Sequence, residues 1–403
     1  MSNKTGESFD PIVQTHTSPV GKFLEELALH IAADLTIVLR PAWLLVIALL
    51  KKLLEAYYEV IKPRFNENGV RRLWIMLNFI YGNLSGVIHE DVLEDGFDKL
   101  DGQDYAEWLG KYLVDDGGLT QNSPWVQFLY DAEFAYVDGD VSKPDLGAGV
   151  SLRTLVRMAF TWKGALLWKM QAGMGDTIFA PMYEALKKRG VKFEFFHRVQ
   201  ELKLSADKKR VERIVVGVQA QLAKPYEPLV DVKGLPCWPS QPLWGQLSAP
   251  TDHSINFEDP KSPILATREY VAGVDFDDVV VGTSIGTLPF LAKELIDHSQ
   301  RWQDMVANVK TVRTQALQLW FKPTAYELGW TAMGRPLMAT FHASPLNTWA
   351  DMSHLIDREA FPYEDGKSPL NIAYFCGPQA VSAEPDALVK QVVKALLETQ
   401  AGW

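Results

Sequence analysis

Glycine pairs that could form a phosphate-binding turn are the first candidates for chemistry in this sequence. A dinucleotide-binding turn needs the pattern G-x-G-x-x-G between a strand and a helix, because the glycines let the backbone approach a pyrophosphate at the helix N-terminus. Gly147 and Gly149 form one pair, and Gly173 and Gly175 form another, but both pairs lack the third glycine. Neither pair follows a predicted strand. The sequence therefore contains no complete dinucleotide-binding motif.

Serine, histidine and cysteine residues do not form a recognisable catalytic or metal-binding set. Ser284 lies between Gly282 and Gly286 at a predicted strand-to-helix turn, which leaves a hydrolase as a minor alternative. The eight histidines are scattered, without a pair at the i, i+4 spacing of metal ligands. The two cysteines, Cys237 and Cys376, are too few for a zinc site or a disulfide framework. We therefore predict no metal site.

Charge and composition limit the possible partners. The 403 residues include 40 Lys and Arg against 50 Asp and Glu, a net charge of −10 without a long run of one sign. A nucleic-acid site needs a basic surface, so we predict no nucleic-acid partner. The 13 Trp, 13 Tyr and 19 Phe suit a site for an apolar small molecule, although aromatic side chains also fill large cores. The low cysteine content indicates a reducing compartment, so we expect a cytoplasmic protein.

Hydrophobic periodicity divides the chain into three parts that would position a site. Residues 1–20 are polar and predict an N-terminal tail. Residues 21–170 carry apolar side chains three and four positions apart, which predicts a helix-rich substrate lobe, with Asp104 as the N-cap of a short helix. Residues 171–403 mix helical and alternating patterns and predict a mixed sheet lobe ending in a helix at residues 385–399. The predicted fold class is therefore α/β or α+β.

Three segments of the sheet lobe are predicted to lie near a site. Residues 191–221 alternate apolar and polar side chains around a short polar stretch, which predicts a two-stranded hairpin. Residues 224–262 are rich in proline and predict an irregular excursion, and long loops of this kind usually form or cover a site. Residues 277–284 begin with the run DDVVVGT, which predicts a strand buried on both faces of a parallel sheet.

The most apolar stretch, residues 35–50, leaves two interpretations open. It carries Arg40 and Pro41 near its middle and is followed by Lys51 and Lys52. It is shorter than the about 20 apolar residues that a membrane-spanning helix needs. We expect a buried helix that begins at Pro41. The alternative is an interfacial helix whose lysines lie at the headgroup level, which implies a peripheral contact with the inner membrane surface.

Two stretches carry a resemblance to a known family. Residues 169–199 read KMQAGMGDTIFAPMYEALKKRGVKFEFFHRV, and residues 276–295 read FDDVVVGTSIGTLPFLAKEL. With this order of glycine turn, helix, returning strand and second strand, the chain resembles the flavin-containing amine oxidase and phytoene desaturase superfamily. More narrowly, it is similar to bacterial carotenoid-desaturase-like flavoproteins. The resemblance covers about residues 71–376, and residues 169–199 are its most specific part.

This resemblance implies that part of an FAD site is present. In the superfamily, the valine that closes the returning strand places its backbone against the adenine of FAD, and Val199 holds that position. Gly282 and Thr283 match the place where the chain turns beside the cofactor. Gly173 and Gly175 would permit a close turn before a helix that Asp176 is expected to cap.

The resemblance also implies two segments that this sequence does not contain. Members of the superfamily begin with a strand, a glycine loop and a helix that hold the diphosphate, and end with an alanine-glycine-aspartate segment beside the flavin. Neither occurs in the 403 residues. We therefore expect an incomplete FAD-binding, amine-oxidase-like architecture, which a second polypeptide carrying the dinucleotide-binding motif would complete.

The function that the resemblance implies is hydride transfer from an apolar substrate to the flavin, as part of an FAD-dependent oxidoreductase. The cofactor carries this chemistry, so no catalytic residue is assigned. The candidates for lining a substrate tunnel are Trp238, Trp244, Trp320 and Phe321. One alternative is a non-enzymatic remnant or a membrane-associated, lipid-binding protein that keeps the substrate lobe, and the other is a hydrolase that uses Ser284.

Overall fold

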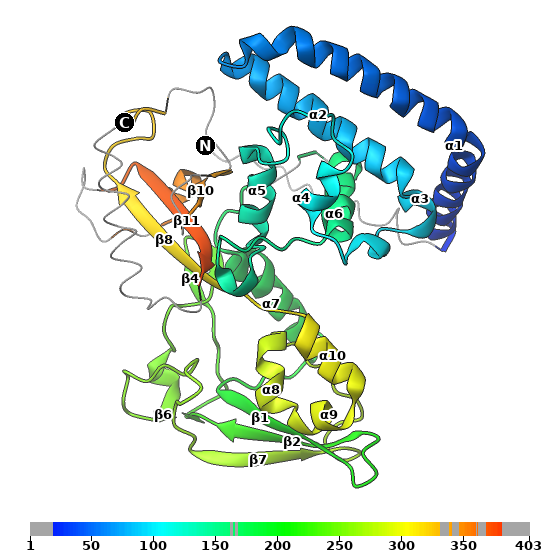
Figure 1. Ribbon diagram of the computed structural model, residues 1–403. Coiled ribbons are helices and arrows are strands. Elements are labelled where there is room, and N and C mark those ends of the chain that lie inside the picture. Colours follow the sequence, from blue (N-terminus) through cyan, green and yellow to red (C-terminus); the bar gives the residue numbers. More distant parts are fainter. Residues whose placement is uncertain are drawn as a thin grey trace. The chain divides into compact units, whose positions relative to one another are not determined.

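The fold is mixed α+β, with helices in the N-terminal half and small antiparallel sheets in the C-terminal half (Figure 1). A computed structural model describes residues 19–161, 164–165, 168–330, 338–340, 346–359, 361 and 368–380, with residues 19–39 and 338–340 described by their backbone alone. Residues 1–18 of the predicted tail and the predicted helix at residues 385–399 lie outside these ranges. The chain divides into a helical unit, residues 1–137 and 142–166, and a sheet unit, residues 138–141 and 167–403.

The helical unit begins with a long antiparallel pair of helices. Its α-helices are α1 (Pro19–Ile61), α2 (Asn68–His89), α3 (Val92–Asp95), α4 (Tyr105–Gly110), α5 (Pro124–Glu133) and α6 (Ala148–Phe160). Arg40 in α1 forms an ion pair of 2.6 Å with Asp91, which follows α2. Near the other end of the pair, the ring centroids of Tyr58 and Trp74 are 4.8 Å apart. These two contacts fix α1 and α2 in opposite directions.

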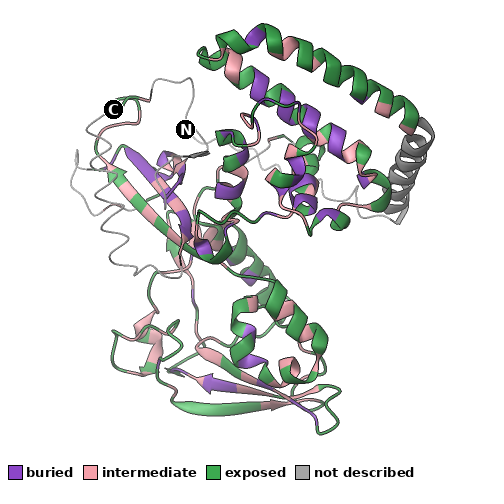
Figure 2. Cartoon of the chain, in the orientation of Figure 1, coloured by how far each residue is buried: buried purple, intermediate pink, exposed green. Residues whose placement is uncertain are grey.

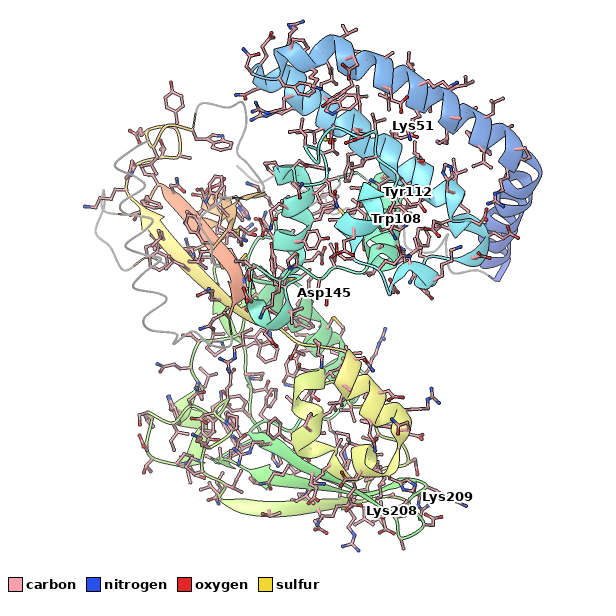
Figure 3. All side chains as sticks on the ribbon, viewed as in Figure 1. Lys51, Trp108, Tyr112, Asp145, Lys208 and Lys209 are labelled. Atoms are coloured by element: carbon pink, nitrogen blue, oxygen red, sulfur yellow. The ribbon has the colours of Figure 1, made fainter. Side chains whose placement is uncertain are left out.

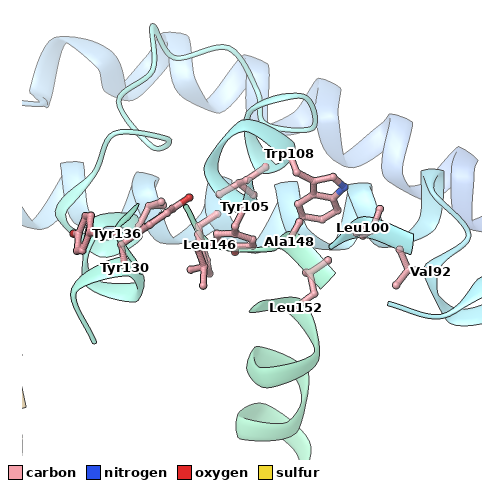
Figure 4. Packing of buried hydrophobic residues seen from close by; sticks show 12 residues of the cluster. Val92, Leu100, Tyr105, Trp108, Tyr130, Tyr136, Leu146, Ala148 and Leu152 are labelled. Atoms are coloured by element: carbon pink, nitrogen blue, oxygen red, sulfur yellow. The ribbon is translucent and has the colours of Figure 1, made fainter. Parts of the chain in front are cut away.

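The core of the helical unit gathers aromatic and aliphatic side chains from α2, α4, α5 and α6 (Figure 4). Trp108 and Leu109 of α4 are fully buried in it. Helix α4 begins as predicted, because the Asp104 carboxylate accepts hydrogen bonds from the backbone N–H groups of Ala106 at 3.0 Å and Glu107 at 3.2 Å. The N-cap therefore fixes the position from which Trp108 enters the core.

The expectation of a buried helix that begins at Pro41 is wrong. Helix α1 continues through Pro41, although a proline removes one backbone hydrogen bond. Leu49 is 57% exposed and Leu53 is 66% exposed, and Figure 2 shows exposed residues along much of α1. The physical reason is that α1 packs against α2 along one side only. None of the helices in the described part of the chain carries an apolar stretch long enough to span a bilayer.

The sheet unit contains four small antiparallel sheets among its described residues. Their strand orders are β1-β2-β7, β8-β11-β10-β9, β3-β6 and β4-β5. The strands are β1 (His197–Leu204), β2 (Val211–Val218), β3 (Gln221–Leu222), β4 (Val230–Val232), β5 (Leu235–Cys237), β6 (Leu247–Ala249), β7 (Ala266–Val271), β8 (Arg313–Phe321), β9 (Met338–Thr340), β10 (Thr348–Asp351) and β11 (Asn371–Gln379). Its helices include α7 (Ala180–Lys188), α8 (Leu288–Leu291), α9 (Lys293–His298) and α10 (Gln300–Asn308).

The hairpin predicted within residues 191–221 is confirmed as β1 and β2. Its strands pair in antiparallel register, and the turn between them carries Lys208 and Lys209 (Figure 3). The pattern of residues 191–196 also alternates, but these residues form no strand. Residues 224–262 are irregular as predicted, apart from the short strands β4, β5 and β6 and a turn of 3-10 helix at Trp244–Gln246.

The prediction of a buried strand at residues 277–284 is wrong. These residues form no strand, and Val280 is 94% exposed. A strand exists only where a neighbouring strand accepts and donates its backbone hydrogen bonds, and no described strand lies beside this segment. The apolar run DDVVVGT therefore has the composition of a buried strand without the neighbour that would bury it.

Candidate functional site

The first candidate site is the face of the β1-β2-β7 sheet on which Val199 lies. The register pairs Val199 with Val216 and Leu202 with Ile214. Directly paired residues of antiparallel strands point to the same face, and so do alternate residues along one strand. Leu202 and Ile214 pack against α8, α9 and α10. Val199 therefore lies on the helix-covered face of this sheet.

Two of the residues predicted to line a cofactor, Val199 and Gly282, are not covered by other parts of the described chain. Val199 is 42% exposed, and its strand β1 is an edge of the sheet, so its outer backbone groups have no strand partner among the described residues. At Gly282, no other atom lies within 4 Å of the position that a Cβ atom would take. The hydroxyl group of Thr283 accepts a hydrogen bond of 3.0 Å from Thr287, just before α8. Val199 thus lies beside unpaired edge backbone, and Gly282, elsewhere in the same unit, has open space around it.

A charged cluster that the sequence analysis missed lies at the same face. Arg268 pairs with Val216 in the register, on the side of β2 opposite Val199. Its guanidinium is 3.4 Å from the Glu194 carboxylate and 4.4 Å from the centre of the Tyr270 ring. The Tyr270 hydroxyl donates a hydrogen bond to Glu194. Burial and this hydrogen bond raise the pKa of Tyr270 to about 12, so the hydroxyl stays a neutral donor.

This cluster can bind the polar part of a ligand that covers Val199, because it presents a guanidinium, a carboxylate and a phenol together. The signal in the sequence was the alternation of REY at residues 268–270, which gives Arg268 and Tyr270 one face of a strand. That pattern could not reveal Glu194 as their partner. The contact depends on strand β7 joining β2, which is a pairing between distant segments.

The turn at Gly173 and Gly175 is held by Trp238. The indole Nε1 of Trp238 donates to the carbonyl oxygen of Gly175 at 2.9 Å, and its backbone N–H donates to the Asp176 carboxylate at 2.8 Å. Asp176 therefore does not cap the helix as expected, since its carboxylate binds a distant backbone group and the helical turn begins at Gly175. Burial and the nearby Asp176 raise the pKa of the Cys237 thiol.

Trp238 and Trp244 belong to one cluster of packed rings. Trp238 lies 5.4 Å from Tyr183, and Trp244 stacks on His253 at 4.5 Å between ring centres. A chain of ring contacts connects the two tryptophans through Phe195, Tyr226, Phe196 and Phe257. The irregular excursion is thus fastened to the start of the β1 hairpin by aromatic contacts.

Trp320 and Phe321 point to opposite faces of the four-stranded sheet, because they are neighbours in β8. Phe321 packs in a cluster with Trp349 and Phe375. Trp320 is 50% exposed and contacts Phe361 at 5.3 Å between ring centres. These two residues therefore do not line one surface, although each remains a candidate for a substrate contact.

A buried polar group fixes the start of the segment at residues 169–199. The Asp351 carboxylate is buried and lies 3.4 Å from the Lys169 ammonium group. It also accepts the backbone N–H of Ser353 at 3.1 Å. The adjacent His354 contacts the carbonyl oxygen of Met170 at 2.7 Å. These contacts hold residues 169 and 170 against the four-stranded sheet. The Lys169–Asp351 pair is therefore structural.

Ser284 lacks the environment of a catalytic serine. The segment from Gly282 to Gly286 has the G-x-S-x-G spacing, but the backbone of Ser284 is extended, with φ −57° and ψ 141°, and is not strained. In the part of the chain that the structure describes, no histidine or carboxylate forms a hydrogen bond with its hydroxyl group. This geometry gives the serine no general base.

Comparison with protein-family models, with curated proteins and with solved structures found no match for this chain.

Proposed function

We propose that this chain is the substrate-side and sheet portion of an FAD-dependent oxidoreductase of the amine oxidase or desaturase type, completed by a second polypeptide that holds the FAD diphosphate. The observation that carries the proposal is the exposure of Val280 and Val281 next to the open position at Gly282. Exposed β-branched residues in a strand-like run are stabilised when another strand covers them. A second polypeptide that adds its strand here would also bring its glycine loop to the cofactor.

The residues around Val199 fit the adenosine end of FAD. The unpaired edge of β1 would supply backbone donors and acceptors, and Gly282 has no neighbouring side chain within 4 Å of its Cβ position that a ligand would displace. Arg268 and Glu194 would contact the polar part of the cofactor. When bound, FAD supplies the electron-accepting chemistry, and the chain positions the substrate and excludes water.

The proposal is tested by purifying the tagged full chain, with its bound partners, from the cells in which it naturally occurs. We expect the preparation to contain FAD, measured by chromatography after denaturation. The substitution Val199→Asp places a carboxylate against the adenine site and should lower the FAD content about tenfold while leaving the partner bound. The substitution Val280→Asp should remove both the partner and the FAD.

Val274→Asp is the matched control, because Val274 is 81% exposed in a turn of the same unit and is not one of the residues of the proposed site. It should leave the FAD content unchanged. A complex without flavin, or a Val199→Asp variant with the FAD content of the unsubstituted chain, would contradict the proposed function.

A further inference from the structure

Helices α1 and α2 share a large exposed surface of aliphatic side chains, which we call the apolar platform. Spacings of three, four and seven residues place its members along one side of each helix. Its members are Leu45, Val46, Leu49, Leu50, Leu53 and Val60 of α1 and Leu73, Met76, Leu77, Ile80 and Leu84 of α2. Scattered exposed leucines are normal on proteins, but a continuous surface of this kind marks an interaction site.

The two halves of the platform point to the same side. Successive residues of an α-helix are rotated by about 100°. On α1, Ile47 and Ile61 lie in one buried cluster with Trp74 and Tyr81 of α2, and the platform residues follow on one flank of that contact. Because α1 and α2 are antiparallel, the platform residues of α2 fall on the corresponding flank. The opposite flank of α2 carries Phe79, which packs into the core of the helical unit.

The charges around the platform are basic. From Arg40 to its ion-pair partner Asp91 there are seven Lys and Arg against five Asp and Glu, a net charge of +2 in a chain whose total is −10. Helical spacing places Lys52 at the outer edge of the platform on α1 and Arg72 at its edge on α2. Lys51 falls on the side of α1 away from the platform, and Glu59 falls beside Lys52 at its outer edge. Glu55 lies on the far side of α1, opposite Val46.

We propose that the apolar platform binds the surface of a membrane that contains anionic lipids. Aliphatic side chains would enter the region between headgroups and acyl chains, and the basic edge would contact lipid phosphates. A protein partner is a poorer match, because protein interfaces also need about one hydrogen bond per 100–200 Å² and the platform presents aliphatic groups alone. Pairing with a second copy would bring two basic edges together. This inference does not depend on the flavin.

The test is sedimentation of the full chain with vesicles of phosphatidylcholine, with and without phosphatidylglycerol. We expect the chain to sediment with the anionic vesicles and to be released by salt. The double substitution Leu49→Glu with Leu53→Glu should weaken binding by at least about a hundredfold. Each change removes a leucine that the membrane would bury and puts a charge in its place. Lys52→Gln and Arg72→Gln should each weaken it about fivefold on anionic vesicles only.

Leu265→Glu is the matched control, because Leu265 is exposed in the sheet unit and outside the platform. It should bind vesicles like the unsubstituted chain. Circular dichroism checks that each variant keeps its helices, as expected for substitutions at exposed positions. Equal binding to neutral and anionic vesicles would overturn the proposal. It would also be overturned if the chain ignored both vesicles and formed oligomers that Leu49→Glu with Leu53→Glu dissociates.

Discussion

Single buried polar residues carry much of the organisation of the helical unit. The Asp116 carboxylate accepts hydrogen bonds from the Trp74 indole at 2.9 Å and from the Asn78 amide at 3.1 Å. The backbone and hydroxyl groups of Thr120 donate to the same carboxylate. Asn78 also exchanges two hydrogen bonds with the backbone of Val114. This network joins the loop around residues 114–120 to α2. Removing a donor from a buried carboxylate lowers the free energy of unfolding, because the acceptor is then left without a partner.

We predict that Asn78→Ala lowers the free energy of unfolding by about 3 kcal/mol, because it leaves Val114 and Asp116 with unpaired buried groups. Urea denaturation followed by circular dichroism measures the change. The control is Asn122→Ala, which removes one exposed hydrogen bond to the carbonyl oxygen of Gly118 and should cost less than about 1 kcal/mol. Equal losses in the two variants would show that the network does not stabilise the unit.

Pairs of helices approach closely where glycine leaves room for a large side chain. Gly86 of α2 faces the ring of Trp108 in α4, and a Cβ atom there would collide with that ring. A Cβ atom at Gly82 would lie 2.9 Å from Leu109, also in α4. Helix α2 therefore uses these two glycines for contact with α4, although glycine disfavours a helix interior.

We predict that Gly86→Ala lowers the free energy of unfolding by about 1–3 kcal/mol, because the collision with Trp108 outweighs the better helix propensity of alanine. In the control, Gly69→Ala, the new methyl group meets no atom within 4 Å. That change in the same helix should stabilise the protein by up to about 1 kcal/mol. Thermal denaturation distinguishes the two signs, and stabilisation by Gly86→Ala would contradict the close packing.

The whole molecule exposes apolar surface in both of its units. The helical unit presents the apolar platform, and the sheet unit presents Val280 and Val281. Surfaces of this kind promote association when their natural partner is missing. The two surfaces have different chemistry, since the platform has a basic edge and the valine run follows Asp277 and Asp278.

We predict that the purified chain self-associates as its concentration rises and that Val280→Lys increases the monomer fraction severalfold, because a charge disfavours burial of the valine run. Light scattering and sedimentation measure the monomer fraction. Val274→Lys, at an exposed position in a turn, should change it little. If the unsubstituted chain stays monomeric at all concentrations, the valine run needs no partner.

Local sequence patterns were sufficient to predict the features that depend on residues close together in the sequence. The Asp104 cap and the hairpin of β1 and β2 were predicted because capping and alternation act within a few residues. The FAD-site residues stay predictions, and the structure shows only that Val199 is partly exposed and that Gly282 has open space beside it. Glu194, Arg268 and Tyr270 were missed, because their contact joins segments that are about 75 residues apart.

The sequence by itself determined the helical first half, the turn chemistry, the absence of a complete dinucleotide-binding motif and the apolar character of residues 277–284. Only the tertiary structure decided which apolar residues are buried. The side chains of α1 and of DDVVVGT are equally apolar whether they are buried or exposed, and their burial depends on whether another element packs against them. Hydrophobicity is a property of each residue, whereas a core forms only where two surfaces meet. No described surface covers the platform side of α1 or residues 277–284.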